Sequence, residues 1–164
     1  LAMIEFPLIN ASIDVPQNMI TIHSNHNIGI AVDGKGGLVV PVLRNCQQMN
    51  IIEIAKELNR LKQLAKDGKL NELDILCPTF TLSNIGSIGG TYMSPVIIPP
   101  QVAIGAMGRI QRVPRFIDDH TDKIEESLIM NVSWGGDHRV LDGATMAKFS
   151  NLWKSFVETP ALMP

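Results

Sequence analysis

This chain of 164 residues has no long apolar run, only a small excess of negative over positive charge, and few cysteines. No apolar run approaches the roughly 20 residues that a membrane helix needs, so a membrane protein is not expected. The formal net charge is −2, which argues against a nucleic-acid binder because such proteins normally carry a basic excess. The two cysteines, Cys46 and Cys77, form no paired motif, which favours a reducing compartment with both thiols buried as small apolar side chains.

The chain is also poor in charge overall, since charged residues make up 18% and apolar residues 45%. Its length is sufficient for one domain with a sizeable core. A low charge content is typical of surfaces that other subunits cover, because buried interfaces are depleted in charge. Residues 1–7 show neither an initiator Met nor a signal peptide and resemble the tail of an element, so we expect the beginning of the domain to be missing.

Strand and helix patterns together predict an α+β domain around a mixed or largely antiparallel sheet. The clearest helix starts after Asn50, a capping residue, and stops at Gly68. A closing helix is expected over residues 143–157, and the polar run 118–123 is expected to be an exposed hairpin tip. Strands are predicted at residues 19–22, 28–32, 38–43, 79–83, 102–110 and 128–134. The strands at 28–32 and 38–43 are expected to form a hairpin around a glycine-rich turn.

One segment near the end, residues 137–143 with the sequence DHRVLDG, carries recognisable acid–base chemistry. An imidazole that titrates near neutrality suits proton transfer, and a nearby carboxylate can hold its surroundings in place. His138 and Asp142 are therefore candidate catalytic residues. The alternative is a histidine in a turn, followed by an aspartate that only caps the helix beginning at Gly143.

A second candidate is the glycine-rich segment that begins at Ser83 and runs to Gly90. It has neither the spacing of a phosphate-binding P-loop nor the Gly-x-Ser-x-Gly pattern of serine hydrolases. The Ser83 hydroxyl, at a strand end, could donate a hydrogen bond to a developing oxyanion, or the segment could be a flexible turn. Structural or solvent-exposed positions are favoured over metal binding for His23, His26 and His120, so no metal site is predicted.

Three segments in register resemble one known family: residues 80–86 (FTLSNIG), 99–105 (PPQVAIG) and 137–143. Together they resemble the catalytic domain of the dihydrolipoamide acyltransferases, the core subunits of 2-oxoacid dehydrogenase complexes. The third segment is similar to the family signature Asp-His-Arg-x-x-Asp-Gly. Because residues 6–12 and 26–31 share the likeness, the resemblance spans essentially the whole chain, residues 1–164.

Within that family, residues 83–92, 130–134 and 149–155 are most similar to the branched-chain acyltransferases. The family's opening helix and first strands have no counterpart in this chain. The resemblance places the basic partner of Asp142 in that missing part.

The resemblance implies a fold like that of chloramphenicol acetyltransferase, with a mixed sheet flanked by helices and trimers that carry active sites at the subunit boundaries. His138 would be the general base, Asp142 would organise its loop, and Ser83 of a neighbouring subunit would stabilise the tetrahedral oxyanion. Coenzyme A would enter from one end and the dihydrolipoyl arm from the other, with the glycine at 108 letting the coenzyme lie near the backbone. The coenzyme side would draw on Asp33, Ser83, Asn84, Ser87, Gly108 and Ile110.

The implied activity is acyl transfer between dihydrolipoamide and coenzyme A, with branched-chain acyl groups favoured and acetyl as the alternative. The implied partners are a homotrimer within a cubic core of about 24 copies or a dodecahedral core of about 60, the separate lipoyl domain, and the 2-oxoacid decarboxylase and dihydrolipoamide dehydrogenase components. The location would be the cytoplasm of a prokaryote or the mitochondrial matrix of a eukaryote. A free-standing acetyltransferase for a small hydroxylated acceptor, and a non-catalytic scaffold, are the other interpretations.

Overall fold

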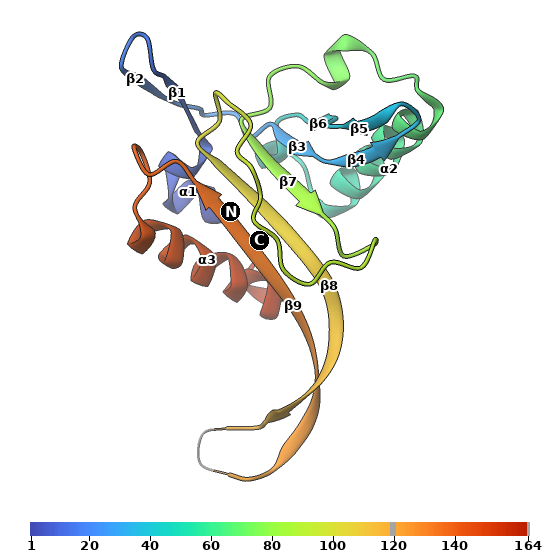
Figure 1. The fold of residues 1–164 in the computed structure, drawn as a ribbon, viewed down its shortest axis with the longest axis vertical. Helices are drawn as coiled ribbons and strands as arrows, with labels where there is room; N and C mark the ends of the chain where they lie inside the picture. The colour runs from blue at the N-terminus through green and yellow to red at the C-terminus, as the bar shows by residue number, and fades with distance from the viewer. Residues whose placement is uncertain (119–120, 164) are drawn as a thin grey trace.

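The structure is a computed structural model that describes residues 1–118 and 121–163. A five-stranded mixed sheet forms the centre of the described chain (Figure 1). Its strands, in spatial order, are β6 (Val42–Leu43), β3 (Ile28–Ile30), β7 (Phe80–Asn84), β8 (Ala103–Phe116) and β9 (Ile124–Gly136). The other strands are β1 (Ala11–Asp14), β2 (Met19–Ile22), β4 (Val32–Gly34) and β5 (Gly37–Val39). The helices are α1 (Ala2–Glu5), α2 (Ile51–Asp67), α3 (Gly143–Glu158) and the 3-10 turns η1 (Pro7–Asn10), η2 (Cys46–Gln48), η3 (Glu72–Asp74) and η4 (Pro160–Leu162).

The direction of the strands confirms the predicted mixed sheet. β7 runs parallel to both β3 and β8, whereas β6 and β9 are antiparallel to their neighbours. The predicted hairpin is more broken than expected, because each of its two long strands divides into two short ones. Pro41 has no N–H to donate, and its carbonyl accepts from Ile30 at 2.8 Å. As a result, β4 and β5 form a separate two-stranded ladder beside the main sheet.

Both predicted helices are confirmed, and local capping explains their bounds. Asn50 and Glu53 form a reciprocal capping box at the start of α2, with both hydrogen bonds at 2.9 Å. Gly68 ends α2 in the left-handed conformation, with φ at 66°. Asp142 caps α3, so the cap that the alternative interpretation of residues 137–143 predicted is present.

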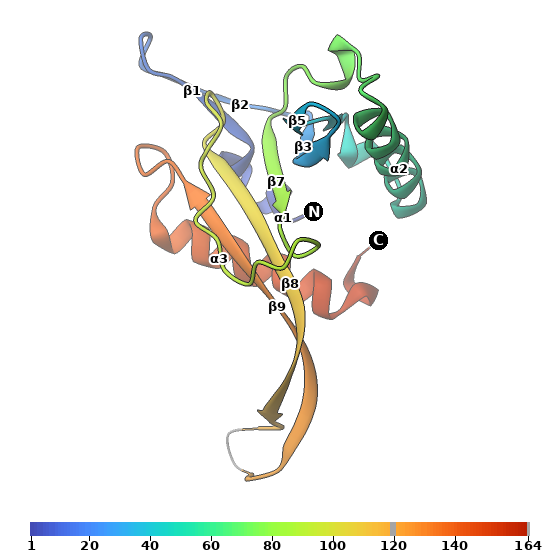
Figure 2. The same cartoon turned by 45° about the vertical axis from the view of Figure 1, so that its right-hand side comes forward.

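The main core lies where α1 and α3 pack on the sheet, with Phe80 and Phe149 fully buried (Figure 2). The indole of Trp134, on β9, packs edge-on against Phe149 with ring centroids 5.1 Å apart and donates a 2.9 Å hydrogen bond to Ser150. An ideal Cβ at residue 105 would lie only 2.5 Å from that indole, so the glycine there is required by packing. These contacts fix the end of β9 against α3.

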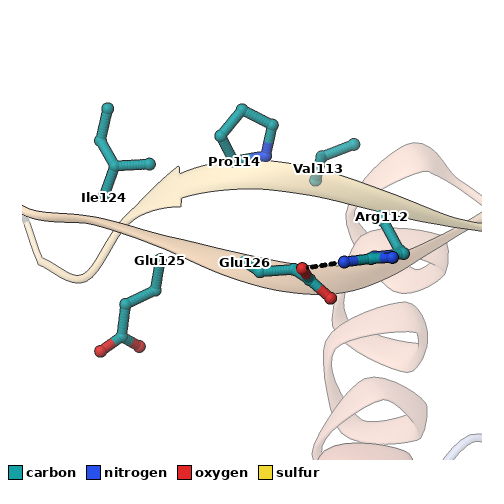
Figure 3. A pocket seen from close by; sticks show the side chains of 6 residues that line it. All are labelled: Arg112, Val113, Pro114, Ile124, Glu125 and Glu126. Carbon is teal, nitrogen blue, oxygen red and sulfur yellow. Dashed lines mark hydrogen bonds and ion pairs between the residues drawn. The ribbon is translucent and has the colours of Figure 1, made fainter.

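β8 and β9 extend beyond the sheet as a twisted two-stranded arm (Figures 1 and 2). Both strands are longer than predicted, because charged residues such as Arg112 and Glu126 lie on an exposed ribbon instead of ending it. Figure 3 shows these two side chains paired across the arm, beside a cavity of about 340 Å³ that β8 and β9 alone line. The predicted tip at 118–123 falls partly on residues 119–120, outside the described residues.

Two expectations from composition can be compared with the structure. Cys46 is only half-buried and Cys77 is exposed, so the expectation that both thiols are buried was wrong. Cys77 lies in a turn with φ at 56°, and a turn at the surface does not bury its side chains. None of the described helices is long and apolar enough to span a bilayer. Within residues 1–118 and 121–163, no three His, Cys, Asp or Glu side chains gather to hold a metal ion.

Candidate active site

His138 lies in a tight turn between β9 and α3, with its side chain exposed to solvent. Backbone hydrogen bonds hold this turn at both ends. The Asp137 N–H donates to the Val102 carbonyl at 2.8 Å, which joins the loop to the beginning of β8. The N–H groups of Val140 and Leu141 both donate to the Asp137 carbonyl at 2.9 Å, and Leu141 is buried. The imidazole is therefore displayed from a rigid backbone.

Asp137 and Arg139, the two residues that flank His138, are joined by a bidentate ion pair. The Arg139 guanidinium donates to both carboxylate oxygens, at 2.9 Å to Oδ1 and 2.5 Å to Oδ2. Oδ1 also accepts from the Arg139 backbone N–H at 3.0 Å, which closes an Asx turn. Hydrogen bonds from the Arg139 side chain and backbone lower the pKa of Asp137 to about 2, so this carboxylate is ionised at any working pH.

Asp142 organises the loop from its other end. Its Oδ1 accepts from the Thr145 N–H at 2.7 Å, and its carbonyl accepts from Met146. Hydrogen bonding from Thr145 lowers the pKa of Asp142, with a smaller contribution from the nearby His138. The carboxylate therefore acts locally as the cap of α3, so its closeness to His138 in sequence does not make it a hydrogen-bonded partner of the imidazole.

Ser83 occupies the carboxyl end of β7, opposite Ala106 on β8. Its side chain is half-buried, and its hydroxyl makes no hydrogen bond with any other described residue. The loop that follows is pinned to β8, because Ile85 N–H donates to the Met107 carbonyl at 3.1 Å and Arg109 N–H to the Gly90 carbonyl at 2.8 Å. A free hydroxyl at the end of a strand, next to a pinned loop, is suited to donate to a developing negative charge.

The strand register separates the two candidate catalytic side chains within one chain. Ser83 is level with Ala106, whereas Asp137 is level with Val102 and lies two strands away. At about 3.3 Å per residue and about 4.8 Å per strand spacing, this places the two backbones about 16 Å apart. Figure 1 shows the arrowheads of β7 and β9 pointing in opposite directions. The structure therefore does not bring His138 and Ser83 of the same chain together.

The predicted coenzyme residues gather at the Ser83 end. Asn84 pairs with Met107, Ser87 lies in the following turn, and Asp33 lies three residues beyond Ile30, which pairs with Leu82. All three of these side chains are exposed, as is Ile110 on β8. The Asn84 carbonyl oxygen Oδ1 already accepts from Gly86 N–H at 2.9 Å, which leaves its amide N–H₂ as the outward-facing donor.

Gly108 belongs to the same end but has a structural explanation of its own. It lies in the irregularity of β8 between Met107 and Ile110. An ideal Cβ there would lie 2.3 Å from the Thr91 carbonyl oxygen and 3.1 Å from that of Asn131. Packing against the chain's own backbone is thus sufficient to explain this glycine, and its role toward the coenzyme stays a prediction.

A larger cavity of about 700 Å³ lies elsewhere, at the amino ends of β7 and β8. Its lining includes the buried Thr79 and Gln101, and neither His138 nor Ser83 contributes to it. Sequence reasoning included Asp137 and Arg139 in the histidine segment but missed the ion pair that joins them. The signal that could have found this pair is the position of Asp137. An aspartate often accepts a hydrogen bond from the backbone N–H two residues later, in an Asx turn, and that residue is Arg139.

The mixed sheet with flanking helices, and a loop histidine after its last strand, define an acyltransferase-type fold. Consistent with this, a chloramphenicol acetyltransferase structure matches with a TM-score of 0.57 over 94% of this chain and 72% of that chain, at 14% identity, which bears on the fold alone. The chain belongs to the family described as 2-oxoacid dehydrogenases acyltransferase (catalytic domain), whose model matches residues 1–164.

Among curated relatives, the mitochondrial lipoamide acyltransferase component of the branched-chain alpha-keto acid dehydrogenase complex of Mus musculus is 55% identical over 163 residues. That alignment covers 99% of this chain and 33% of the relative, so the chain spans about a third of the relative's length.

Two solved structures are similar at 31% identity. The dihydrolipoamide acetyltransferase of Azotobacter vinelandii superposes with a TM-score of 0.88 over 96% of this chain and 63% of that chain. It was studied for a serine, a histidine and an asparagine in its catalytic mechanism, the asparagine four residues after the histidine. The cubic core of a pyruvate dehydrogenase multienzyme complex gives a TM-score of 0.87 over 94% of this chain and 62% of that chain.

Proposed function

We propose that this domain transfers a branched-chain acyl group between dihydrolipoamide and coenzyme A within a 2-oxoacid dehydrogenase complex. The observation that carries the proposal is the 55% identity to a branched-chain lipoamide acyltransferase component over 99% of the chain. The solved dihydrolipoamide acetyltransferase and the solved pyruvate dehydrogenase core are less similar to this chain, at 31% identity each. Acyl groups that differ by a methylene are discriminated by only about 1–3 kcal/mol, so acetyl remains the competing substrate.

In this reaction His138 is the general base. Its imidazole accepts the proton of the attacking thiol, and the sulfur forms a bond to the thioester carbonyl carbon of the other substrate. The resulting oxyanion accepts a hydrogen bond from the Ser83 hydroxyl. The intermediate collapses when the bond to the leaving sulfur breaks, and that sulfur takes the proton back from His138. The serine and histidine of the Azotobacter vinelandii enzyme, with a third residue four positions after the histidine, support this assignment.

The site assembles between neighbouring copies in a trimer. The separation of about 16 Å between the backbones of His138 and Ser83 in one chain supports this proposal, because the two side chains cannot approach to the roughly 3 Å of a hydrogen bond. The Ser83 end also carries exposed large apolar side chains, with Ile88 83% and Tyr92 78% accessible. The similar cubic core supports a higher assembly of trimers, in which a lipoyl domain and the decarboxylase and dihydrolipoamide dehydrogenase components meet the core.

Coenzyme A is taken up at the Ser83 end, where Asp33, Asn84, Ser87 and Ile110 are exposed. The free amide N–H₂ of Asn84 and the hydroxyl of Ser87 are donors for the coenzyme's polar groups. The exposed side chain of Arg109 adds positive charge for its phosphates. If the source is a eukaryote, the mitochondrial name of the mouse relative supports a location in the matrix.

The test is a comparison of acyl donors on the full chain. Rates of transfer to dihydrolipoamide are measured with isobutyryl-, isovaleryl- and acetyl-coenzyme A. We expect kcat/KM to be about 10- to 100-fold higher for the branched donors. Preference for acetyl would overturn the acyl assignment. Absence of transfer from every donor, in a particle that light scattering shows to be assembled, would favour the scaffold interpretation.

A further inference from the structure

The residues on either side of His138 hold each other directly. Asp137 and Arg139 are two positions apart, and their side chains are joined by three hydrogen bonds of 2.5–3.2 Å. A fourth bond joins Asp137 Oδ1 to the Arg139 N–H. The Asp137 backbone is in turn tied to Val102. The loop thus has a chain of contacts from β8, through the carboxylate, to both sides of the imidazole.

We propose that Asp137 and Arg139 form a positioning clamp, which fixes the backbone direction from which His138 presents its imidazole to the thiol. The inference rests on the proposed function, in which His138 is the base. Neither member of the clamp is a catalytic residue, because both side chains are committed to each other.

The geometry supports positioning more than stability. The Asp137 side chain is 16% accessible, but that of Arg139 is 57% accessible, and ion pairs with a member this exposed contribute little to folding. A misplacement of a reacting group by about 1 Å can lower a rate about 100-fold. The clamp confines the one residue of the loop whose position matters for proton transfer, while Asp142 fixes the far end of the loop at Thr145.

The two members predict different responses to conservative change. Asp137→Asn keeps an oxygen that can accept the Arg139 N–H but loses the charge pairing. Arg139→Lys keeps the charge, but an ammonium cannot form the fork that binds both carboxylate oxygens. A positioning role therefore predicts partial rescue by Asp137→Asn relative to Asp137→Ala, and little rescue by Arg139→Lys relative to Arg139→Gln.

The experiment measures kcat, KM for both thiol substrates and thermal midpoint in the full chain. Asp137→Ala should lower kcat about 10- to 100-fold and Asp137→Asn less, while each KM stays within about twofold and Tm within a few degrees. The control is Arg112→Gln, which breaks a more exposed ion pair on the arm and should leave kcat unchanged. If Asp137→Ala does not fold, Asp137→Asn and Arg139→Gln decide the question.

The clamp is overturned if Asp137→Ala, or Asp137→Asn and Arg139→Gln in its place, keep the wild-type kcat while His138→Ala is inactive. The proposed function stands in that case. The clamp is also overturned if the loss of kcat only follows a loss of folded protein. If His138→Ala itself keeps its activity, the proposed base is wrong, and the clamp is rejected together with it.

Discussion

The two ends of the central sheet differ in how they hold their functional side chain. At the His138 end, a short turn is braced by the Asp137–Arg139 pair, by the bond to Val102 and by the Asp142 cap. At the Ser83 end, the hydroxyl has no hydrogen bond to another described residue, and the segment that follows carries the exposed apolar side chains of Ile88 and Tyr92. One end is braced within the chain, whereas the other displays a hydroxyl without a hydrogen bond to the described part of the chain. The difference supports the proposal that each chain contributes half of two sites.

The largest effect is expected at the braced end. His138→Ala should lower kcat about 10²- to 10⁴-fold, because a positioned general base contributes that much to proton transfer. Steady-state transfer of acyl groups from coenzyme A to dihydrolipoamide measures the loss. Lys148→Ala, an exposed change on α3, is the control and should retain full activity. A kcat of His138→Ala within tenfold of the wild-type value would contradict a general base at the His138 end of the sheet.

A smaller effect is expected at the Ser83 end. Ser83→Ala should lower kcat about 10²- to 10³-fold with little change in KM, since one oxyanion donor is lost. The same assay with Ser94→Ala, at an exposed serine of the following segment, provides the reference. If Ser83→Ala raised KM alone, the hydroxyl would bind the coenzyme without stabilising the oxyanion.

Gly108→Ala tests how firmly the Ser83 loop is pinned to β8. The new Cβ would meet the Thr91 carbonyl oxygen at 2.3 Å, and overpacking of this kind costs about 1–3 kcal/mol of unfolding free energy. Urea denaturation measures the change. Gly36→Ala is the matched control, because nothing lies within 4 Å of its ideal Cβ. Equal stabilities for the two variants would mean that this loop is loosely held.

The smallest effect is expected for the helix cap. The pKa of Asp142 is lowered in the folded state, so its stabilisation is present above the usual carboxyl range and is lost as pH falls through the lowered pKa. Asp142→Ala should therefore lower Tm by a few degrees at pH 7 and not at strongly acidic pH. Asp142→Asn, which keeps an oxygen for the Thr145 N–H, should restore most of the midpoint at pH 7. An Asp142→Ala midpoint equal to the wild type would show that the cap is dispensable.

The parts of the fold that could be predicted depend on neighbours in the sequence. Asn50 and Gly68 delimit α2 by local capping, and the glycine-rich turn at 33–37 locates a reversal of the chain. The length of the β8–β9 arm could not be predicted, because charged residues are tolerated wherever both faces of a ribbon meet water. Cys77 was misjudged since its exposure depends on a turn with positive φ that its residue type does not indicate.

The candidate site shows the same limit. His138, Asp142 and Ser83 were identified as single residues, but their separation depends on the register of three strands, which no local pattern specifies. The ion pair of Asp137 with Arg139 depends on the geometry of the turn that joins them. Residue identity therefore suggested a chemical role for each residue, and only the arrangement of strands shows that His138 and Ser83 of one chain lie apart.

The most direct test of the shared site mixes two inactive variants. His138→Ala and Ser83→Ala chains are unfolded, combined in equal amounts and refolded together, and acyl transfer is compared with each variant refolded alone. In a closed ring, one boundary in four pairs an intact His138 with an intact Ser83 of its neighbour, so activity should recover to about a quarter of the wild-type rate. Mixed assemblies no more active than the separate variants would contradict a site shared between chains.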